Sequence, residues 1–183
     1  MEIKYFELAY EDIEQISRME SKFFSTPWSE ASIGHYAEAG NTIFVVARND
    51  EPYVSDAMNM SAASGNAANV TANICDGHRE EELPRRVVGY AAVLCAADEG
   101  NLVSIGVEED CREMGIATEL LDIAYEMALE RGVTSINLEV RESNEPAITM
   151  YEKEGFVKVG KRPNFYRNPT EDALLYIKQI SQE

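Results

Sequence analysis

The stretch from Cys111 to Leu121, CREMGIATELL, constrains the fold of this chain more than any other. It follows a strand-like run, Asn101–Val107, and leads into a helical pattern over Ala117–Glu130. The apolar residues of that pattern share one side of the helix: Leu120, Leu121, Ala124, Met127 and Ala128. The stretch therefore predicts a strand–loop–helix unit with Gly115 at the start of the helix.

The start of this helix is a candidate phosphate site. The first N–H groups of a helix have no partner inside it, and the helix dipole makes that end positive. Gly115 tolerates a positive φ and close approach of a ligand, so Gly115 to Thr118 can present N–H groups to a pyrophosphate, with Arg112 at the rim. Alternatively, Gly115 only makes a tight turn. The loop lacks the Lys-Ser/Thr pair of a Walker loop and the three glycines of a dinucleotide fingerprint.

The rest of the chain alternates strand and helix patterns. Strands are predicted at Ile3–Leu8, Thr42–Arg48, Val87–Cys95, Ser135–Val140, Phe156–Val159 and Leu174–Ile177. Helices are predicted at Glu11–Phe24, from a Ser29 cap to Tyr36, and at Asn144–Glu154. This order predicts an α/β (or α+β) sheet with helices on both faces.

One segment departs from this pattern. Residues 50–86 separate two strands that would otherwise form a hairpin, and Ala57–Ile74 carries no charge and neither helical nor strand periodicity. We expect a single domain over residues 1–183 with a long surface insertion at about 50–86. We favour a tolerated insertion, and a functional lid is the alternative.

Charge and composition exclude several classes of function. The chain carries 33 acidic and 16 basic residues, a formal net charge of −17, which argues against nucleic-acid binding. This charge suits a basic polypeptide substrate, although solubility alone explains it equally well. There is no apolar run long enough for a membrane helix, no signal-peptide pattern, and no cysteine spacing typical of a disulfide framework or a zinc site. We therefore expect a cytoplasmic monomer or weak dimer that uses no metal and no membrane.

Five short motifs of this chain together resemble the GNAT superfamily of N-acetyltransferases. In chain order they are PWSE at Pro27–Glu30, Arg112-x-x-Gly115-x-Ala117, LEVR at Leu138–Arg141, AITMYEKEGF at Ala147–Phe156 and RPNFY at Arg162–Tyr166. Within the superfamily the chain is similar to bacterial ribosomal-protein-alanine N-acetyltransferases. The likeness covers nearly everything except the insertion.

The resemblance implies a mixed, mostly antiparallel sheet of six to seven strands with about four helices, splayed where acetyl-CoA binds as co-substrate. It assigns the pantetheine arm to Ile105, Gly106, Val107 and Asn144. It assigns the pyrophosphate to Arg112, Glu113, Met114, Gly115, Ile116, Ala117 and Thr118. From the sequence alone, Asn144 can also serve only as the cap of its helix.

Two side chains are candidates for acid–base chemistry. Alternation by two puts Asn137, Glu139 and Arg141 on one face of a strand, and the resemblance makes Glu139 the proton acceptor, with a solvated polar face as the alternative. The resemblance makes Tyr151 the proton donor to the CoA thiolate, with a packed aromatic as the alternative. Ordinary pKa values of ~10 for tyrosine and ~8.5 for a thiol make that transfer mildly uphill. No histidine is well placed to activate a nucleophile, so we expect direct transfer without an acyl-enzyme.

The sequence leaves the acceptor amine open. By family analogy Trp28 and Tyr166 form walls of an acceptor groove, and either can instead be a core residue. We expect an N-terminal acetyltransferase whose partner is the N-terminus of a ribosomal protein and whose target is an N-terminal alanine. The alternatives are an enzyme acting on lysine or a small amine, and a catalytically silent acetyl-CoA-binding or partner-binding module.

Overall fold

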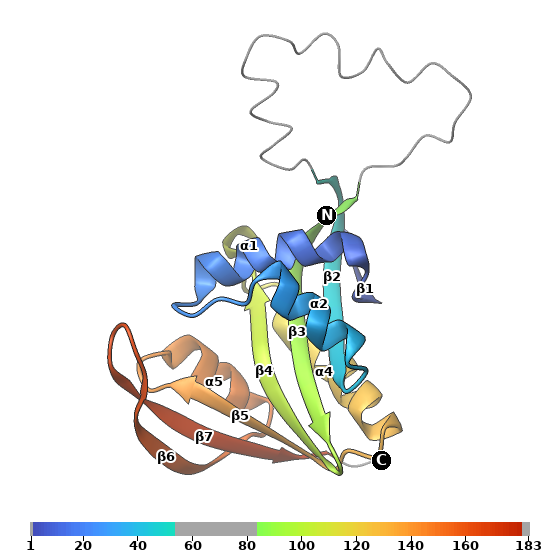
Figure 1. Ribbon diagram of the computed structural model, residues 1–183. Coiled ribbons are helices and arrows are strands. Elements are labelled where there is room, and N and C mark those ends of the chain that lie inside the picture. The colour runs from blue at the N-terminus through green and yellow to red at the C-terminus, as the bar shows by residue number, and fades with distance from the viewer. Residues whose placement is uncertain (1, 54–83, 181–183) are drawn as a thin grey trace, which may run out of the picture.

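A computed structural model describes residues 2–53 and 84–180, which fold around a seven-stranded sheet (Figure 1). The strands are β1 (Ile3–Glu7), β2 (Thr42–Pro52), β3 (Arg85–Ala96), β4 (Glu99–Val107), β5 (Ser135–Arg141), β6 (Val157–Tyr166) and β7 (Glu171–Gln179). The helices are α1 (Ile13–Phe23), α2 (Glu30–Glu38), α4 (Ile116–Glu130) and α5 (Glu145–Lys153), with 3-10 turns at Tyr10–Asp12 and Glu109–Cys111. No helix in the two described stretches is long and apolar enough to cross a membrane.

The sheet has the strand order β1-β2-β3-β4-β5-β7-β6. All neighbours pair antiparallel except β4 and β5, which pair parallel over Glu99–Leu102 and Ser135–Leu138. Beyond those residues the two strands separate, and Figure 1 shows their carboxyl ends pointing in different directions. The prediction of a mixed, mostly antiparallel sheet with a splayed centre is confirmed.

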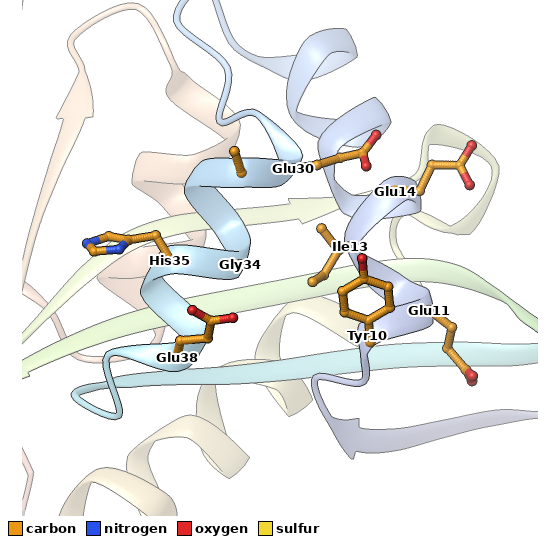
Figure 2. A pocket seen from close by; sticks show the side chains of 9 residues that line it. Tyr10, Glu11, Ile13, Glu14, Glu30, Gly34, His35 and Glu38 are labelled. Atoms are coloured by element: carbon orange, nitrogen blue, oxygen red, sulfur yellow. The ribbon is translucent and has the colours of Figure 1, made fainter.

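Two helices lie over the face of the sheet formed by β2 and β3, where they bury a small apolar cluster. Ile16 and Met19 of α1 and Ile33 of α2 pack against Phe44 and Tyr90. Between α1 and α2 the surface holds an open recess of about 690 Å³ (Figure 2). Its rim is acidic, since four glutamates line it: Glu11, Glu14, Glu30 and Glu38.

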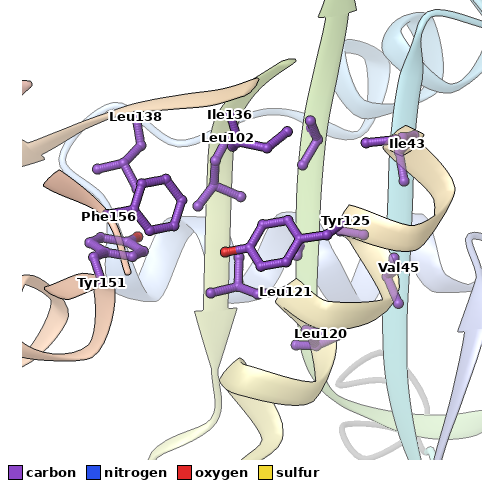
Figure 3. Packing of buried hydrophobic residues seen from close by; sticks show 14 of the residues in the cluster. Ile43, Val45, Leu102, Leu120, Leu121, Tyr125, Ile136, Leu138, Tyr151 and Phe156 are labelled. Atoms are coloured by element: carbon purple, nitrogen blue, oxygen red, sulfur yellow. The ribbon is translucent and has the colours of Figure 1, made fainter. Parts of the chain in front are cut away.

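The opposite face carries the larger core, which α4 and α5 cover. Leu120 and Leu121 of α4 are fully buried in the same cluster as Ile43 and Val45 of β2 (Figure 3). On the far side of the split, Leu138, Tyr151 and Phe156 extend the same cluster. One continuous core therefore supports both halves of the separated sheet.

Local signals in the sequence define the helix ends. The Ser29 hydroxyl accepts a hydrogen bond from the Ser32 N–H at 3.2 Å, and Asn144 caps α5 in the same way through the Ala147 N–H at 3.3 Å. Gly115 precedes α4 with φ +80°, and Gly132 follows it with φ +81°. Both glycines occupy the left-handed region that other residues rarely adopt.

The structure corrects several predicted boundaries. The first strand of the last β-hairpin, β6, runs from Val157 to Tyr166, well past the predicted end at Val159. The prediction stopped early because most side chains of this edge strand are exposed and show no apolar alternation. The first helix starts at Ile13, after a 3-10 turn. The strands that flank the expected insertion extend past their predicted ends, since β2 continues to Pro52 and β3 begins at Arg85. Residues 54–83 lie outside the described residues, so the insertion stays a prediction.

Two buried tyrosines differ in their hydrogen bonding. The Tyr90 hydroxyl donates to the Glu20 carboxylate, which is 2% exposed, and lies 2.9 Å from the Ser104 hydroxyl. The Tyr125 hydroxyl of α4 is also buried, but it has no hydrogen-bond partner within the described chain. Because a buried polar group without a partner costs free energy, the two hydroxyls make opposite contributions to stability.

We expect Tyr90→Phe to lower the free energy of unfolding by about 1–3 kcal/mol, because it removes a partner of a buried carboxylate. Tyr125→Phe should leave it unchanged or raise it by up to about 1 kcal/mol, because it removes an unpaired hydroxyl. Urea unfolding of the two variants beside the wild type makes the comparison. Equal losses in both would contradict the hydrogen-bond pattern.

Candidate active site

The candidate site is built on the split between β4 and β5. Beyond the last parallel pair, Leu102 and Leu138, β4 stays paired with β3 up to Val107 and β5 stays paired with β7 up to Arg141. The inner edges of both strands therefore face the gap with no strand partner across it. Backbone groups on such an edge can hydrogen bond to an extended ligand, as an added strand would.

The residues predicted to contact pantetheine lie on this edge of β4. Ile105 and Val107 are half-buried and pack toward the α4 face, whereas Gly106 is buried on the other face. A Cβ added to Gly106 would lie 2.9 Å from the Phe23 ring and 3.1 Å from the Tyr90 ring. The missing side chain at Gly106 thus lets α1 approach the strand closely beside the split.

The loop before α4 ends in an open helix N-terminus. The first helical hydrogen bond runs from the Glu119 N–H to the Gly115 carbonyl at 3.1 Å, so the N–H groups of Ile116, Ala117 and Thr118 have no acceptor within the helix. A Cβ at Gly115 would meet no atom within 4 Å. Three successive donors at the start of α4 thus have no acceptor within the helix, and there is open space beside Gly115, as an anion site requires. The Thr118 hydroxyl donates to the Glu154 carboxylate at 2.9 Å, so only the backbone N–H of Thr118 is available there.

The residues of this loop that were predicted to contact the pyrophosphate differ in their exposure and contacts. The Arg112 Nε donates to the Val107 carbonyl at 3.2 Å, and its guanidinium lies 5.5 Å from the centre of the Phe23 ring. Glu113 and Met114 are exposed, whereas Ile116 is buried in the core, so only its backbone is available to a ligand. The geometry thus brings the loop to the open end of the split.

Acidic residues next to the loop could repel a phosphate, but two of them are neutralised. The Lys22 ammonium lies 2.7 Å from the Glu108 carboxylate, and the Arg86 guanidinium lies 2.9 Å from the Asp110 carboxylate. The hydrogen bond from Arg86 holds the pKa of Asp110 below its ordinary value. These pairs reduce the negative potential in front of the α4 N-terminus, which fits an anionic ligand better than the sequence alone indicates.

Glu139 is the first residue of β5 beyond the parallel pairs, and the predicted alternation of this strand is confirmed. Its side chain is 27% exposed, and its carboxylate lies 2.8 Å from the Arg162 guanidinium. Its backbone carbonyl accepts a hydrogen bond from the Tyr166 hydroxyl at 3.1 Å. Glu139 and Arg162 also line an open groove of about 430 Å³ that reaches Asn137. An acceptor or a water molecule can therefore reach this carboxylate.

Tyr151 projects from α5 into the core beside the split. It is 6% exposed, and its ring packs edge-on against Phe156 at 5.6 Å (Figure 3). Burial, and to a smaller degree the neighbouring Tyr166, raise the pKa of Tyr151 above its ordinary value. The phenol is therefore neutral at working pH. It can donate a hydrogen bond to a departing sulfur, but full proton transfer is less favourable than the ordinary pKa values suggest.

The two predicted groove residues are placed differently. The Trp28 ring stacks on Tyr36 at 4.8 Å and meets Phe44 edge-on at 6.3 Å, so its ring contacts are those of a core residue. Tyr166 instead lies at the split, where it contacts Glu139 and lies 4.3 Å from the Arg141 guanidinium. The alternative of a packing role thus describes Trp28 better than it describes Tyr166.

Sequence reasoning did not single out the two arginines next to Glu139. The sequence did carry a signal for both: Arg162 belongs to the RPNFY motif, and Arg141 lies on the same predicted strand face as Glu139. A cation expected beside the candidate base could have identified them. Cys111 is buried, and this burial raises the pKa of its thiol, which argues against a reactive thiolate. Within residues 2–53 and 84–180, no group of His, Cys, Asp and Glu could hold a metal ion.

Comparison with known proteins finds relatives that are N-acetyltransferases. The chain is 26% identical over 172 residues to a candidate ribosomal protein bS18-alanine N-acetyltransferase of Bacillus subtilis (strain 168), covering 94% of this chain and 92% of the relative. It is 35% identical over 100 residues to the Escherichia coli (strain K12) ribosomal protein bS18-alanine N-acetyltransferase, covering 52% and 66%.

Solved structures share the fold. The crystal structure of the ribosomal-protein-S18-alanine N-acetyltransferase from Escherichia coli matches with a TM-score of 0.73 at 22% identity, covering 100% of this chain and 96% of that one. The family model described as "Acetyltransferase (GNAT) family" matches residues 65–156, a stretch that contains β4, the loop, α4, β5 and α5. The chain therefore belongs to the GNAT family of acetyltransferases.

Proposed function

We propose that this enzyme transfers an acetyl group from acetyl-CoA directly to the α-amine of a protein N-terminus, with ribosomal protein bS18 as the substrate. The observation that carries the proposal is the accessible Glu139 carboxylate at the point where β4 and β5 separate. The relatives that act on bS18 support the choice of acceptor.

The residues around the split fit acetyl-CoA, which supplies the acetyl group as an activated thioester. We assign the pyrophosphate to the N–H groups of Ile116, Ala117 and Thr118, because they have no acceptor within the helix and adjoin the open space beside Gly115. We assign the pantetheine arm to the free edge of β4 from Ile105 to Val107. Asn144 already caps α5 through its side-chain oxygen, so any contact with pantetheine would use its remaining polar groups.

In the proposed reaction a bond forms between the amine nitrogen and the acetyl carbon, and the bond between that carbon and sulfur breaks. Glu139 takes the amine proton, directly or through a water molecule. The neutral Tyr151 hydroxyl donates a hydrogen bond to the departing sulfur. Glu139 begins the unpaired part of β5, and Tyr151 lies in the core cluster beside the same strand; a base and a donor so placed argue against a catalytically silent module.

The choice of an α-amine follows from the ease of deprotonation. An α-amine has a pKa of ~7.7–8.0 and a lysine ~10.4, so near pH 7 an α-amine is neutral far more often. That difference is worth ~3 kcal/mol before chemistry begins. Glu139 is a single carboxylate that also forms an ion pair with Arg162, so it suits the α-amine, which loses its proton more easily than lysine does.

We expect Glu139→Gln to lower kcat at neutral pH by about a hundredfold, a typical contribution of a general base, while the Kd for acetyl-CoA stays the same. The loss should shrink as the pH rises through the pKa of the α-amine, because free amine then accumulates without the base. Turnover against pH and calorimetric binding measure the two effects. Glu142→Gln is the matched control, because Glu142 is an exposed carboxylate paired with Lys161. A pH-independent loss in Glu139→Gln would instead indicate a structural role.

The acceptor is tested with three peptides: one beginning Ala-Arg, its N-blocked twin, and an N-blocked peptide with an internal lysine. We expect acetylation of the first peptide alone, located at its α-amine by mass spectrometry. The rate should fall as salt rises, because the Debye length shrinks from ~10 Å at 0.1 M to ~3 Å at 1 M and screens the −17 charge.

Efficient labelling of lysine in an N-blocked peptide would contradict the proposal and favour the lysine alternative. Equal rates on the free peptide at both salt concentrations would preserve the activity and remove only the electrostatic attraction. Binding of acetyl-CoA without transfer to any peptide or small amine would identify the silent module instead.

A further inference from the structure

Arg141 joins three segments that are distant in the sequence. It ends β5 and lies on the same strand face as Glu139, two residues earlier. Its guanidinium reaches across the split to the loop between α1 and α2, where Nη2 donates to the Ser25 hydroxyl at 2.9 Å. The strand that carries the candidate base is thereby tied directly to this loop.

The same guanidinium also holds the segment between β6 and β7. Its Nη1 atom donates to the Glu171 carboxylate at 3.1 Å and to the Pro169 carbonyl at 3.3 Å. Its Nη2 atom donates to the Arg167 carbonyl at 3.3 Å, and its plane lies 4.3 Å from the centre of the Tyr166 ring. Every terminal nitrogen is thus engaged with the protein itself, which makes Arg141 a poor candidate for binding substrate.

The α1–α2 loop is also fixed from its other side. The Trp28 N–H donates to the buried Glu20 carboxylate at 3.1 Å, and the Trp28 carbonyl accepts from the Ser17 hydroxyl at 3.2 Å. Both partners lie on α1, so this helix holds the far end of the loop while Arg141 holds Ser25. The loop therefore keeps one position relative to β5.

Only an arginine suits this junction. Its planar fork offers several donors in fixed directions, whereas lysine is a point charge on a flexible stem. The Arg141 side chain is 22% exposed and Glu171 is 15% exposed, so solvent screens their ion pair only partly. Hydrogen bonds from Ser143, and then from Arg141, lower the pKa of Glu171, which keeps that carboxylate charged at working pH.

We infer that Arg141 is the positioning residue that sets both walls of the acceptor groove, the α1–α2 loop and the β6–β7 segment, at a fixed distance from Glu139. The inference rests on the proposed function, because these walls matter only if an acceptor peptide lies between them. Arg141 acts through its neighbours and takes no part in moving the proton.

The test compares Arg141→Lys and Ser25→Ala with the wild type on the Ala-Arg peptide. We expect the KM for the peptide to rise about tenfold in Arg141→Lys, the equivalent of one lost hydrogen bond to a charged group, and about threefold in Ser25→Ala. The kcat and the KM for acetyl-CoA should change little. The double variant should be no worse than Arg141→Lys alone, since both changes break the same contact.

Matched controls separate this role from general stability. Ser21→Ala removes a hydroxyl that donates only within α1, to the Ser17 carbonyl at 3.0 Å. Arg131→Lys replaces an exposed arginine that contacts the Gly40 carbonyl, away from the split. Neither control should change the KM for the peptide.

Hydrogen exchange gives a readout that does not depend on activity. Amides of residues 24–29 and 167–171 should exchange faster together in Arg141→Lys, and only the first set should do so in Ser25→Ala. An unchanged peptide KM in both variants, or an equal rise in the KM for acetyl-CoA, would overturn the inference. If the wild type does not acetylate the peptide, the proposed function fails, and unchanged exchange in both loops would then overturn the inference separately.

Discussion

The short parallel pairing of β4 and β5 is the constraint on which the rest of the site depends. Only four residue pairs join the strands, after which each strand follows its own antiparallel neighbour. Full pairing of β4 with β5 would satisfy the backbone groups on their facing edges, whereas here these edges are free beyond Leu102 and Leu138. The core behind the split is continuous, so the same apolar cluster supports the strands on both sides of the opening.

Charge around the split is arranged in pairs. Lys22 and Arg86 neutralise carboxylates beside the loop, and Arg162 contacts the candidate base. Tyr151 is held in an apolar environment that keeps it neutral. The loop before α4, which we propose binds phosphate, is therefore less negative than the net charge of −17 suggests. Local pairing, more than total charge, decides what binds there.

Much of the fold could be predicted from the sequence, because its signals are local. Ser29, Gly115 and Asn144 mark helix starts, and the alternation around Glu139 follows from a strand with one buried face. The exposed edge strand β6 was underestimated, because its side chains lack a buried face. The local pattern predicted only the first residues of this strand, up to Val159.

The contacts between distant segments were missed for the same reason. The Glu20–Tyr90–Ser104 cluster joins α1 to two strands, and the Arg141–Ser25 bond spans 116 positions in the sequence. The half-buried Trp28 ring packs on Tyr36 and Phe44, which come from other elements, and its predicted place in the acceptor groove stays a prediction. Tertiary packing determines these placements, and a single sequence carries no direct record of it.

The central claim, that the α4 N-terminus beside the split binds acetyl-CoA, is tested by two glycine variants. Gly115 and Gly132 bracket α4 with φ of +80° and +81°, and a Cβ at either would meet no atom within 4 Å. Gly115→Val and Gly132→Val should therefore lose similar stability, about 1–2 kcal/mol from backbone strain. Calorimetry with acetyl-CoA should show the Kd rising at least about tenfold in Gly115→Val, by loss of the phosphate contacts, and little change in Gly132→Val. Equal affinity in the two variants would contradict the account.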